Sequence, residues 1–297
     1  MGIIRNVLLT GVTGYLGSNL AIRLLDEGYK LIVLKRRSSN LDRINKILDE
    51  ITIFDVEDTD YDQLFRTHII DAVIHTAASY GRNGESLIEV YDANVNVPLR
   101  ILQYAIKHGV RYFFNSATTL PSNLNIYALS KNHFSDIAKM NSDKITVVDI
   151  KLEYFYGPYD DVSKFVTYII SSFKDNKAEI DLSPCTQVRD FIYISDVVDA
   201  YSKLLRNLTF ADKYNVIPLG TGTGIRMRQL IEIIQSHFPN ADTKLNFGAL
   251  PIRNNEVMYS VSDIEYLNNI GWSPKYDISQ GIKLTVDIEK KYTHDSN

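Results

Sequence analysis

The sequence feature that most restricts the fold of this chain is a set of three glycines at three-residue spacing, Gly11, Gly14 and Gly17. An apolar segment at residues 7–9 precedes them, and residues 19–25 continue with apolar side chains at helical spacing. A buried parallel strand, a tight turn and a helix N-terminus produce this order. In such a turn, backbone N–H groups approach a pyrophosphate at the positive end of the helix dipole, and a side chain at Gly11 or Gly14 would block that approach. A glycine-rich turn alone is often an ordinary loop, but the flanking strand and helix favour a dinucleotide site.

The second predicted strand, residues 30–34, ends in three consecutive cations, Lys35, Arg36 and Arg37. This position lies about 20 residues beyond the glycines, where a dinucleotide fold meets the adenosine ribose. An NAD-selective site places Asp or Glu there, whereas guanidinium and ammonium groups neutralise and hydrogen-bond a 2′-phosphate. We therefore expect NADP(H) as the coenzyme. A solvated basic loop is the alternative interpretation.

The third predicted strand, residues 51–54, ends at Asp55 and Val56. A carboxylate at this strand end is suited to accept a hydrogen bond from the adenine amino group, and a simple helix cap is the alternative. We expect both residues to contact the coenzyme together with the glycine turn. The residues of the turn that we expect in contact are Gly11, Thr13, Gly14, Tyr15 and Leu16.

The fourth predicted strand, residues 71–78, ends at the edge where ligands bind in open α/β sheets. Its last residues are small and let the backbone pass against the middle of the coenzyme; they are Thr76, Ala77 and Ala78. His75 lies inside the strand and is interpreted as a core histidine rather than a catalyst. The polar segment that follows includes Tyr80, which we expect to contact the substrate.

A hydroxyl-rich segment and a Tyr–Lys pair point to acid–base chemistry. The fifth predicted strand opens into Ser116 and Thr118, and a helical stretch then carries Tyr127 and Lys131 one turn apart on one face. An ammonium beside a phenol, with the positive nicotinamide of the oxidised coenzyme, lowers the pKa of the phenol. Tyr127 is then a usable acid–base group near neutral pH. About one Tyr-x-x-x-Lys is expected by chance, so the position of this pair after the fifth strand is what makes it informative.

Composition limits the remaining possibilities. The 297 residues are 45% hydrophobic, which is ample for a buried core, and the net charge of −4 gives no reason to expect nucleic acid or an anionic membrane as a partner. No apolar run approaches the length of a membrane span, and Met1 leads directly into the first strand, so we expect no signal peptide. The single cysteine, Cys185, excludes internal disulfides, is interpreted as an inert buried thiol and fits a reducing cytoplasm. We expect no bound metal.

The combination of the glycine turn, these strand ends, Asn94, Ser116 and the Tyr127–Lys131 pair resembles the extended short-chain dehydrogenase/reductase family. Later segments resemble its nucleotide-sugar branch of epimerases, dehydratases and 4-ketoreductases. These segments are Tyr156-Gly157-Pro158, Arg189-Asp190-Phe191 and Gly271-Trp272-x-Pro274. The resemblance covers nearly the whole chain. It implies an α/β fold with a Rossmann-type doubly wound parallel sheet and a smaller mixed α/β substrate domain.

The resemblance also implies a division of the chain into two domains. The expected bounds are 1–156 and about 187–219 for the NADP-binding domain, and 157–186 and 220–297 for the sugar-nucleotide-binding domain. Residues 215–219 are expected to return to the main sheet. Members of the family pair through helices that correspond to residues 95–108 and 128–140, so we expect a homodimer.

Carried over residue by residue, the resemblance gives Tyr127 the role of proton donor. Lys131 would tune the pKa of Tyr127 and hold the nicotinamide ribose. Ser116 would hydrogen-bond the reacting oxygen, with Thr118 as a second hydroxyl close by. The residues implied to bind the sugar nucleotide are Tyr80, Arg189, Arg253 and Glu256, with the two arginines on the diphosphate. Surface arginines in ordinary salt bridges are the alternative.

Two departures from the family pattern affect the expected chemistry. Dehydratases of this branch carry an Asp-Glu pair directly after the catalytic hydroxyl residue, whereas this chain has Ala117 and Thr118 there. Neither side chain is an acid or a base at neutral pH, so dehydration is not expected. The usual Asn before Tyr-Gly-Pro is replaced by Tyr154, which we expect beside the coenzyme.

We therefore expect an NADPH-dependent 4-ketoreductase that acts on a nucleotide-linked 4-keto-6-deoxyhexose, a dTDP- or CDP-sugar. Products of such reductases are used for O-antigen and other surface polysaccharides. An NAD-dependent nucleotide-sugar 4-epimerase is the first alternative, because an epimerase regenerates its coenzyme in every cycle. A non-catalytic NADP-sensing protein is the second, although a sensor has no need of the Tyr127–Lys131 pair.

Overall fold

The computed structural model describes residues 4–294 and divides the chain into two units. The first unit comprises Met1–Leu152 and Val198–Pro218, and the second comprises Glu153–Val197 and Leu219–Asn297. Residues 153–156, 187–197 and 219, which the sequence analysis assigned to the first domain, belong to the second unit. The expectation that rests on Met1 lies outside the described residues.

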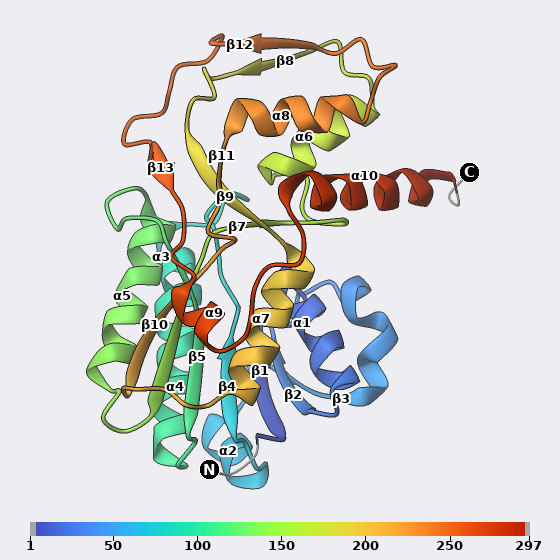
Figure 1. The fold of residues 1–297 in the computed structure, drawn as a ribbon. Helices are drawn as coiled ribbons and strands as arrows, with labels where there is room; N and C mark the ends of the chain where they lie inside the picture. The colour runs from blue at the N-terminus through green and yellow to red at the C-terminus, as the bar shows by residue number, and fades with distance from the viewer. Residues whose placement is uncertain (1–3, 295–297) are drawn as a thin grey trace. The chain divides into compact units, whose positions relative to one another are not determined.

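A seven-stranded sheet forms the centre of the first unit, with the strand order β10-β6-β5-β4-β1-β2-β3 (Figure 1). Its strands are β1 (Asn6–Thr10), β2 (Lys30–Lys35), β3 (Ile51–Asp55), β4 (Ala72–His75), β5 (Tyr112–Thr118), β6 (Thr146–Leu152) and β10 (Tyr214–Leu219). The strand pairs from β6 to β3 are parallel, and β1 lies between β2 and β4. The strands that follow β1 in the chain, β2 and β3, therefore lie on one side of it, and β4, β5 and β6 lie on the other side. In an open α/β sheet, this switch point is where a ligand binds.

The sequence predicts this sheet well. The glycine turn joins β1 to α1, as expected, and residues 215–219 form β10 at the edge of the main sheet, which confirms their predicted return. The fourth strand is shorter than the apolar run suggested. It ends at His75, because the backbone of Thr76 and Ala77 turns to bond with Thr10 instead.

Helices and two less regular turns connect the strands of the first unit. They are α1 (Tyr15–Asp26), η1 (Asp42–Glu50), α2 (Tyr61–Thr67), α3 (Leu87–Tyr91), the π-helical turn η2 (Asp92–Asn96), α4 (Val97–Lys107) and α5 (Ile126–Met140). A further helix, α7 (Ile194–Arg206), runs across a unit boundary. Side chains from β1, β5 and α5 meet in one apolar core, which includes Leu8, Phe113 and Phe134, all 0% exposed.

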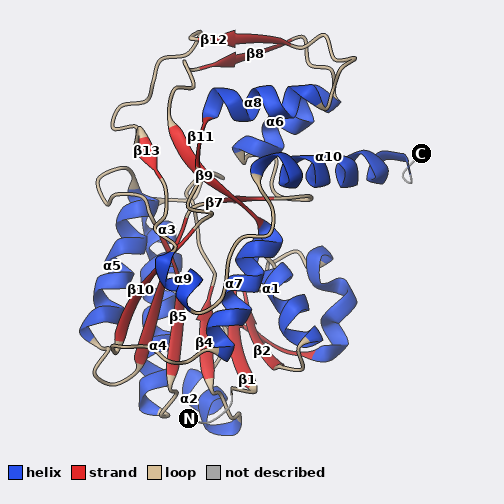
Figure 2. Ribbon diagram, in the orientation of Figure 1, coloured by secondary structure: helices blue, strands red, loops and turns tan. Residues whose placement is uncertain are grey.

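The second unit has a smaller sheet and its own core. The strands β7 (Tyr154–Tyr156), β9 (Val188–Tyr193), β11 (Gly224–Arg226) and β13 (Tyr259–Ser260) form a four-stranded sheet, and β8 (Glu179–Leu182) pairs with β12 (Lys244–Phe247). Its helices are α6 (Phe165–Lys174), α8 (Met227–Ser236), α9 (Glu265–Asn269) and α10 (Ile278–His294). Figure 2 shows β8 beside β12 and α6 beside α8, and the packed helices bury Ile169, Ile231 and Ile282.

One expectation from composition is met by a described residue. Cys185 is a free, buried cysteine, and burial raises the pKa of its thiol, as expected for an inert side chain. None of the helices in residues 4–294 combines the length and the apolar character that crossing a bilayer requires.

Candidate active site

The glycine turn is built as a strand-to-helix turn with an open helix end. Gly14 is the N-cap of α1 and no side chain caps the first turn of that helix. Gly11 has a φ of +73°, and the Gly14 N–H donates to its carbonyl at 2.9 Å. Unbonded N–H groups at the first turn of a helix favour an anionic ligand, so the turn fits the pyrophosphate of a dinucleotide.

The three glycines serve different purposes. A Cβ at Gly11 would lie 2.6 Å from the Ala77 nitrogen, and a Cβ at Gly17 would lie 2.1 Å from the Gly11 carbonyl oxygen. A Cβ at Gly14 would meet one atom, the same Gly11 oxygen, at 3.2 Å. These contacts add a requirement for glycine at positions 11 and 17 that the sequence analysis did not identify. Gly11 and Gly17 are required because the protein's own backbone fills the space.

The small residues after β4 close this turn from the other side. The Thr76 hydroxyl donates to the Thr10 carbonyl at 2.7 Å, and the Ala77 N–H donates to the Thr10 hydroxyl at 3.3 Å. His75 is 0% exposed and shares a 2.8 Å hydrogen bond with the same hydroxyl. Burial holds the pKa of His75 well below its usual value, which confirms the interpretation of a neutral core histidine.

Neighbouring carboxylates compensate most of the positive charge of the basic triplet. Lys35 forms an ion pair with Asp55 at 2.5 Å, and Arg37 pairs with Asp58. Arg36 is exposed and, within residues 4–294, is the member of the triplet without an ion pair. The Asp55 carboxylate, expected to face adenine, is thus bonded to a cation in this structure, and Val56 continues the backbone pairing with Lys35.

Tyr127 is the centre of a small group of hydroxyls in the first unit. It lies in the first turn of α5, whose N-cap residue Asn125 accepts from the Ala128 N–H at 2.8 Å. Burial and the neighbouring Tyr80 raise the pKa of Tyr127 well above its usual value, and a hydrogen bond with Thr118 opposes that shift. The structure therefore brings Thr118 and Tyr80 to the predicted proton donor.

The Ser116 hydroxyl is bonded to a different tyrosine. It lies 2.7 Å from the hydroxyl of Tyr201, a 0% exposed residue of α7, and the Ser116 side chain is itself buried. Thr118, two residues further along β5, is therefore the hydroxyl that contacts Tyr127. Tyr201 was not identified from the sequence, because nothing in the spacing of α7 distinguishes a tyrosine that bonds to a serine 85 positions away from an ordinary core aromatic.

Lys131 lies one helical turn beyond Tyr127 and is 1% exposed. Its ammonium nitrogen has no hydrogen-bond partner among the described residues. Loss of hydration lowers the pKa of Lys131 to about 8, although the carboxylate of Asp149 acts in the opposite direction. A buried ammonium without acceptors is costly unless a ligand supplies them, and the hydroxyls of a coenzyme ribose are suitable acceptors.

In the second unit, the predicted substrate residues form one cluster. Arg189 is 3% exposed and donates to the Glu256 carboxylate at 2.5 Å, and its guanidinium lies over the Tyr154 ring at 5.5 Å. Arg253 is exposed, and its backbone carbonyl accepts from the Glu256 N–H at 3.2 Å. Tyr154, assigned to the coenzyme from the sequence, is thus beside a predicted diphosphate-binding arginine.

A buried acid in this cluster was not identified from the sequence. Glu153 is 6% exposed, and the Ser260 hydroxyl lies 2.8 and 2.9 Å from its two carboxylate oxygens. Burial raises the pKa of Glu153 to about 7. Its neighbour in the chain, Tyr154, drew attention as a departure from the family pattern, whereas Glu153 matches no motif.

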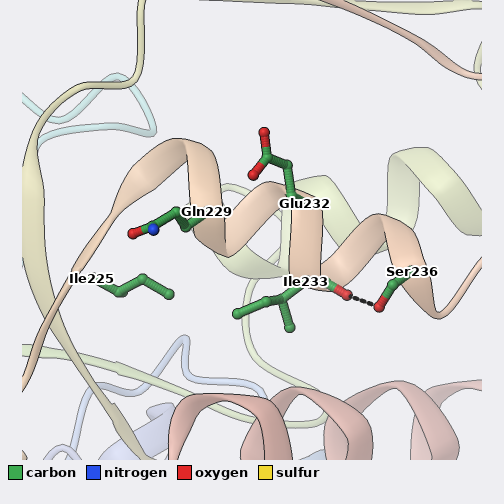
Figure 3. Close-up of a pocket in the computed structure, with 5 residues that line it drawn as sticks. All are labelled: Ile225, Gln229, Glu232, Ile233 and Ser236. Atoms are coloured by element: carbon green, nitrogen blue, oxygen red, sulfur yellow. Dashed lines mark hydrogen bonds between the residues drawn. The ribbon is translucent and has the colours of Figure 1, made fainter.

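A surface pocket on the second unit lies apart from these residues in the sequence. It runs along α8 and is open to solvent (Figure 3). Its lining residues are Ile225, Gln229, Glu232, Ile233 and Ser236. None of them is among the predicted site residues, and the Ser236 hydroxyl is already bonded to the Ile233 carbonyl at 2.7 Å.

Comparison with known proteins gives a consistent picture. The sequence profile described as "NAD dependent epimerase/dehydratase family" matches residues 7–220. CDP-abequose synthase of Salmonella muenchen is 31% identical over 295 residues, which span 96% of this chain and 98% of that protein. The structure of Thermotoga maritima UDP-glucose 4-epimerase with UDP-glucose has a TM-score of 0.84 at 23% identity, covering 97% of this chain and 99% of that one. The structure of Bacillus cereus UDP-glucuronic acid 4-epimerase with UDP-glucuronic acid and NAD has a TM-score of 0.83 at 21% identity, covering 97% and 99%.

Proposed function

The chain belongs to the NAD dependent epimerase/dehydratase family, within the extended short-chain dehydrogenases/reductases, and from this premise we propose that it is an NADPH-dependent 4-ketoreductase. Its substrate would be a nucleotide-linked 4-keto-6-deoxyhexose, a dTDP- or CDP-sugar. The similarity to CDP-abequose synthase over nearly the whole chain supports a role in deoxysugar formation. The observation that carries the proposal is the phenol of Tyr127, bonded to Thr118, with the unpartnered ammonium of Lys131 one turn away.

The coenzyme, when bound, supplies a hydride to the C4 carbonyl of the sugar. Tyr127 donates its proton to the carbonyl oxygen, and Thr118 stabilises the charge that develops there by a hydrogen bond. The Lys131 ammonium holds the nicotinamide ribose and favours the phenolate that remains after proton transfer. We assign the contact with the reacting oxygen to Thr118, because the Ser116 hydroxyl is bonded to Tyr201.

The absence of a carboxylate pair supports reduction over dehydration. Elimination of the C6 hydroxyl needs an acid and a base beside the sugar, whereas Ala117 and Thr118 follow Ser116 on β5. Neither side chain ionises near neutral pH. In the same proposal, Arg36 recognises the 2′-phosphate, because its guanidinium has no ion pair within residues 4–294, whereas Lys35 and Arg37 are already bound to carboxylates.

For the sugar nucleotide, we assign Arg189 and Arg253 to the diphosphate, with Tyr154 as an aromatic support for the Arg189 guanidinium. The Glu256 carboxylate now accepts from Arg189, so a diphosphate would replace one anion by another. We further propose that the chain acts as a homodimer through α4 and α5.

A nucleotide-sugar 4-epimerase with tightly held NAD⁺ is the second candidate. One observation favours it: acidic residues surround the basic triplet, since Asp55 and Asp58 form ion pairs there and the Glu57 carboxylate accepts from the Arg37 N–H at 3.1 Å. These carboxylates neutralise two of the three cations at the ribose position, which weakens the case for a 2′-phosphate.

One experiment separates the two candidates. The purified protein is mixed with NADPH and a panel of 4-keto-6-deoxy sugar nucleotides, and oxidation of the coenzyme is followed by absorbance. The 4-ketoreductase predicts consumption of one NADPH for each ketone reduced, and NMR of the product gives the configuration at C4. Interconversion of two unoxidised sugar nucleotides without added coenzyme would support the epimerase and reject the reductase.

A further inference from the structure

The turn that follows β4 carries a residue whose position was not expected. Tyr80 is predicted to contact substrate, and its ring is stacked on that of Tyr127, with centroids 4.6 Å apart and planes inclined by 28°. The guanidinium of Arg82 lies over the Tyr80 ring, 5.3 Å from its centroid. The predicted proton donor is therefore one half of a pair of phenols, flanked by a cation.

This stack is held by buried hydrogen bonds rather than by the two rings alone. Asn94, in η2, is 0% exposed; its side chain accepts from the Ser79 N–H and donates to the Ser79 carbonyl, both at 2.8 Å. The same amide group donates to the Ser130 hydroxyl at 2.9 Å, and Ser130 lies on α5 three residues after Tyr127. Asn94 thus ties the backbone beside Tyr80 to the helix that carries Tyr127.

The backbone of the turn is also specified. Gly81 has a φ of +65°, a region that favours glycine, and a Cβ there would lie 3.1 Å from a methyl group of Val90. A larger residue at this position would move Tyr80 relative to α5. The conformation of Gly81 therefore fixes where Tyr80 lies relative to Tyr127.

The charges and dipoles around the Tyr127 hydroxyl come from three segments. After burial itself, Tyr80 is the neighbour that raises its pKa most, and it also hydrogen-bonds with Tyr127. Thr118, on β5, and Arg82, in the turn, lower the pKa. Lys131 is the cation on the same face of α5. Thr118 and Tyr80 both contact the acid, and Tyr80 is the one of the two whose proton is phenolic and therefore more acidic than that of an aliphatic hydroxyl.

We propose that Tyr80 is a positioning residue that returns a proton to Tyr127 during each turnover. The proposal rests on the proposed ketoreductase function. When Tyr127 gives its proton to the sugar oxygen, the O–H bond of Tyr80 breaks and a new O–H bond forms on Tyr127. Tyr80 then takes a proton from solvent water, which its partly exposed side chain can reach. Overall, one proton from water and one hydride from the coenzyme are added to the ketone.

This arrangement also favours one direction of the reaction. Reduction of a ketone needs Tyr127 as a protonated acid, whereas oxidation of a sugar hydroxyl needs it as a phenolate base. A second phenol in contact stabilises the protonated form. The pair therefore suits an enzyme that begins with a ketone, whereas an epimerase needs the phenolate for its first step and the protonated acid only for its second.

The test replaces one oxygen atom and keeps the ring. Tyr80→Phe preserves the stack but removes the proton carrier, and Tyr91→Phe, on α3, removes a hydroxyl that lies 3.4 Å from a His133 nitrogen. We expect Tyr80→Phe to lower kcat about tenfold, less than the roughly 10²–10⁴ that loss of a general acid costs, with KM unchanged. The solvent isotope effect on kcat should also change in Tyr80→Phe and stay unchanged in Tyr91→Phe. A raised KM with unchanged kcat would overturn the proposal and restore the substrate contact.

A second readout does not depend on activity. In the coenzyme-free protein labelled with ¹³C at tyrosine Cζ, the Tyr127 signal is identified by its loss in Tyr127→Phe and followed with pH. Tyr80→Phe should lower the pKa of Tyr127, and Tyr91→Phe should not. If Tyr80→Phe leaves that pKa unchanged, the phenol pair is rejected whatever the reaction. If the pKa responds but no 4-keto sugar is reduced, the proposed function fails while the pair itself stands.

Discussion

Two buried cations, one in each unit, are held in opposite ways. Lys131 is 1% exposed, and its ammonium has no hydrogen-bond partner among the described residues. Arg189 is 3% exposed and donates to the carboxylate of Glu256 at 2.5 Å. A buried charge without a partner costs free energy, whereas removing one member of a buried pair leaves the other uncompensated. Lys131 is therefore kept for function at the expense of stability, while Arg189 contributes to the stability of its own unit.

The comparison also separates how the two cations meet a ligand. A ribose hydroxyl that accepts from Lys131 satisfies a group that is otherwise unsatisfied, so binding gains the full hydrogen bond. A phosphate that reaches Arg189 has to displace Glu256. Its binding therefore gains only the difference in free energy between the two ion pairs. We therefore expect the coenzyme site to be ready for its ligand and the diphosphate site to rearrange.

The largest expected effect is the loss of activity in Lys131→Met. We expect kcat to fall by roughly 10²–10³, within the range for groups that support acid–base catalysis, because the phenolate of Tyr127 loses its cation. The free energy of unfolding of the coenzyme-free protein should stay the same or rise, because an unpaired buried charge is removed. Steady-state kinetics and urea denaturation check both parts. The exposed Lys46 of η1 gives the control, Lys46→Met, which should change neither quantity.

Arg189→Met should show the opposite pattern in the second unit. It leaves Glu256 without its cation, so we expect the free energy of unfolding to fall by about 2–3 kcal/mol, somewhat less than the roughly 3–5 kcal/mol for a fully buried pair. The control is Arg228→Met, which breaks the exposed pair with Glu232 and should cost less than about 1 kcal/mol. Equal losses in the two variants, measured by urea denaturation, would remove the distinction between the cations.

The pH dependence of stability sharpens the comparison, because each unit holds one buried group with a displaced pKa. Lys131 has its pKa lowered to about 8 from 10.5, so the unfolded chain binds more protons between these values and stability rises with pH there. Glu153 has its pKa raised to about 7 from 4.5, so stability falls as the pH rises through that interval. Each contribution is of the order of 1–3 kcal/mol.

The measurement is urea denaturation at a series of pH values. Lys131→Met should abolish the rise above about pH 8 and leave the lower interval unchanged. Glu153→Gln should abolish the fall between about pH 4.5 and 7 and leave the upper interval unchanged. A wild-type profile that matches both variants throughout would show that neither group carries its displaced pKa in solution.

The smallest expected effect concerns the basic triplet. Arg36→Ala should raise the KM for NADPH about tenfold, the scale of one charge-assisted hydrogen bond, and should leave the KM for NADH unchanged. Arg37→Ala should change either value by less, because Arg37 is bound to Asp58. An equal loss of both coenzymes in Arg36→Ala would refute recognition of a 2′-phosphate.

The sequence predicts those parts of the molecule that follow from local pattern. The three glycines, with a strand before them and a helix after them, specify the turn between β1 and α1, and the four-residue spacing places Tyr127 and Lys131 on one face of α5. Even there, one reason for a glycine was missed, since Gly11 is also required by the backbone of Ala77, a contact across 66 residues of chain.

The parts that sequence does not predict depend on contacts between distant segments. In the sequence, Ser116 and Thr118 are both candidates for a hydroxyl in acid–base chemistry. Only the structure shows that the Ser116 hydroxyl is bonded to Tyr201. Likewise, the sequence does not distinguish Lys35 and Arg37 from Arg36 as candidates for phosphate binding. In the structure, Lys35 and Arg37 are neutralised by carboxylates from the end of β3 and the residues after it. Side-chain partners of this kind are set by tertiary packing rather than by spacing.

The most direct test of the account follows one hydride and one proton. The protein is given a 4-keto-6-deoxy sugar nucleotide and NADPH that carries deuterium at the transferable position of nicotinamide C4, and the product is examined by NMR. The account predicts one deuterium at sugar C4 for each NADPH consumed, with the rate reduced by roughly 10²–10⁴ in Tyr127→Phe. A product without deuterium at C4, or an unchanged rate in Tyr127→Phe, would contradict it.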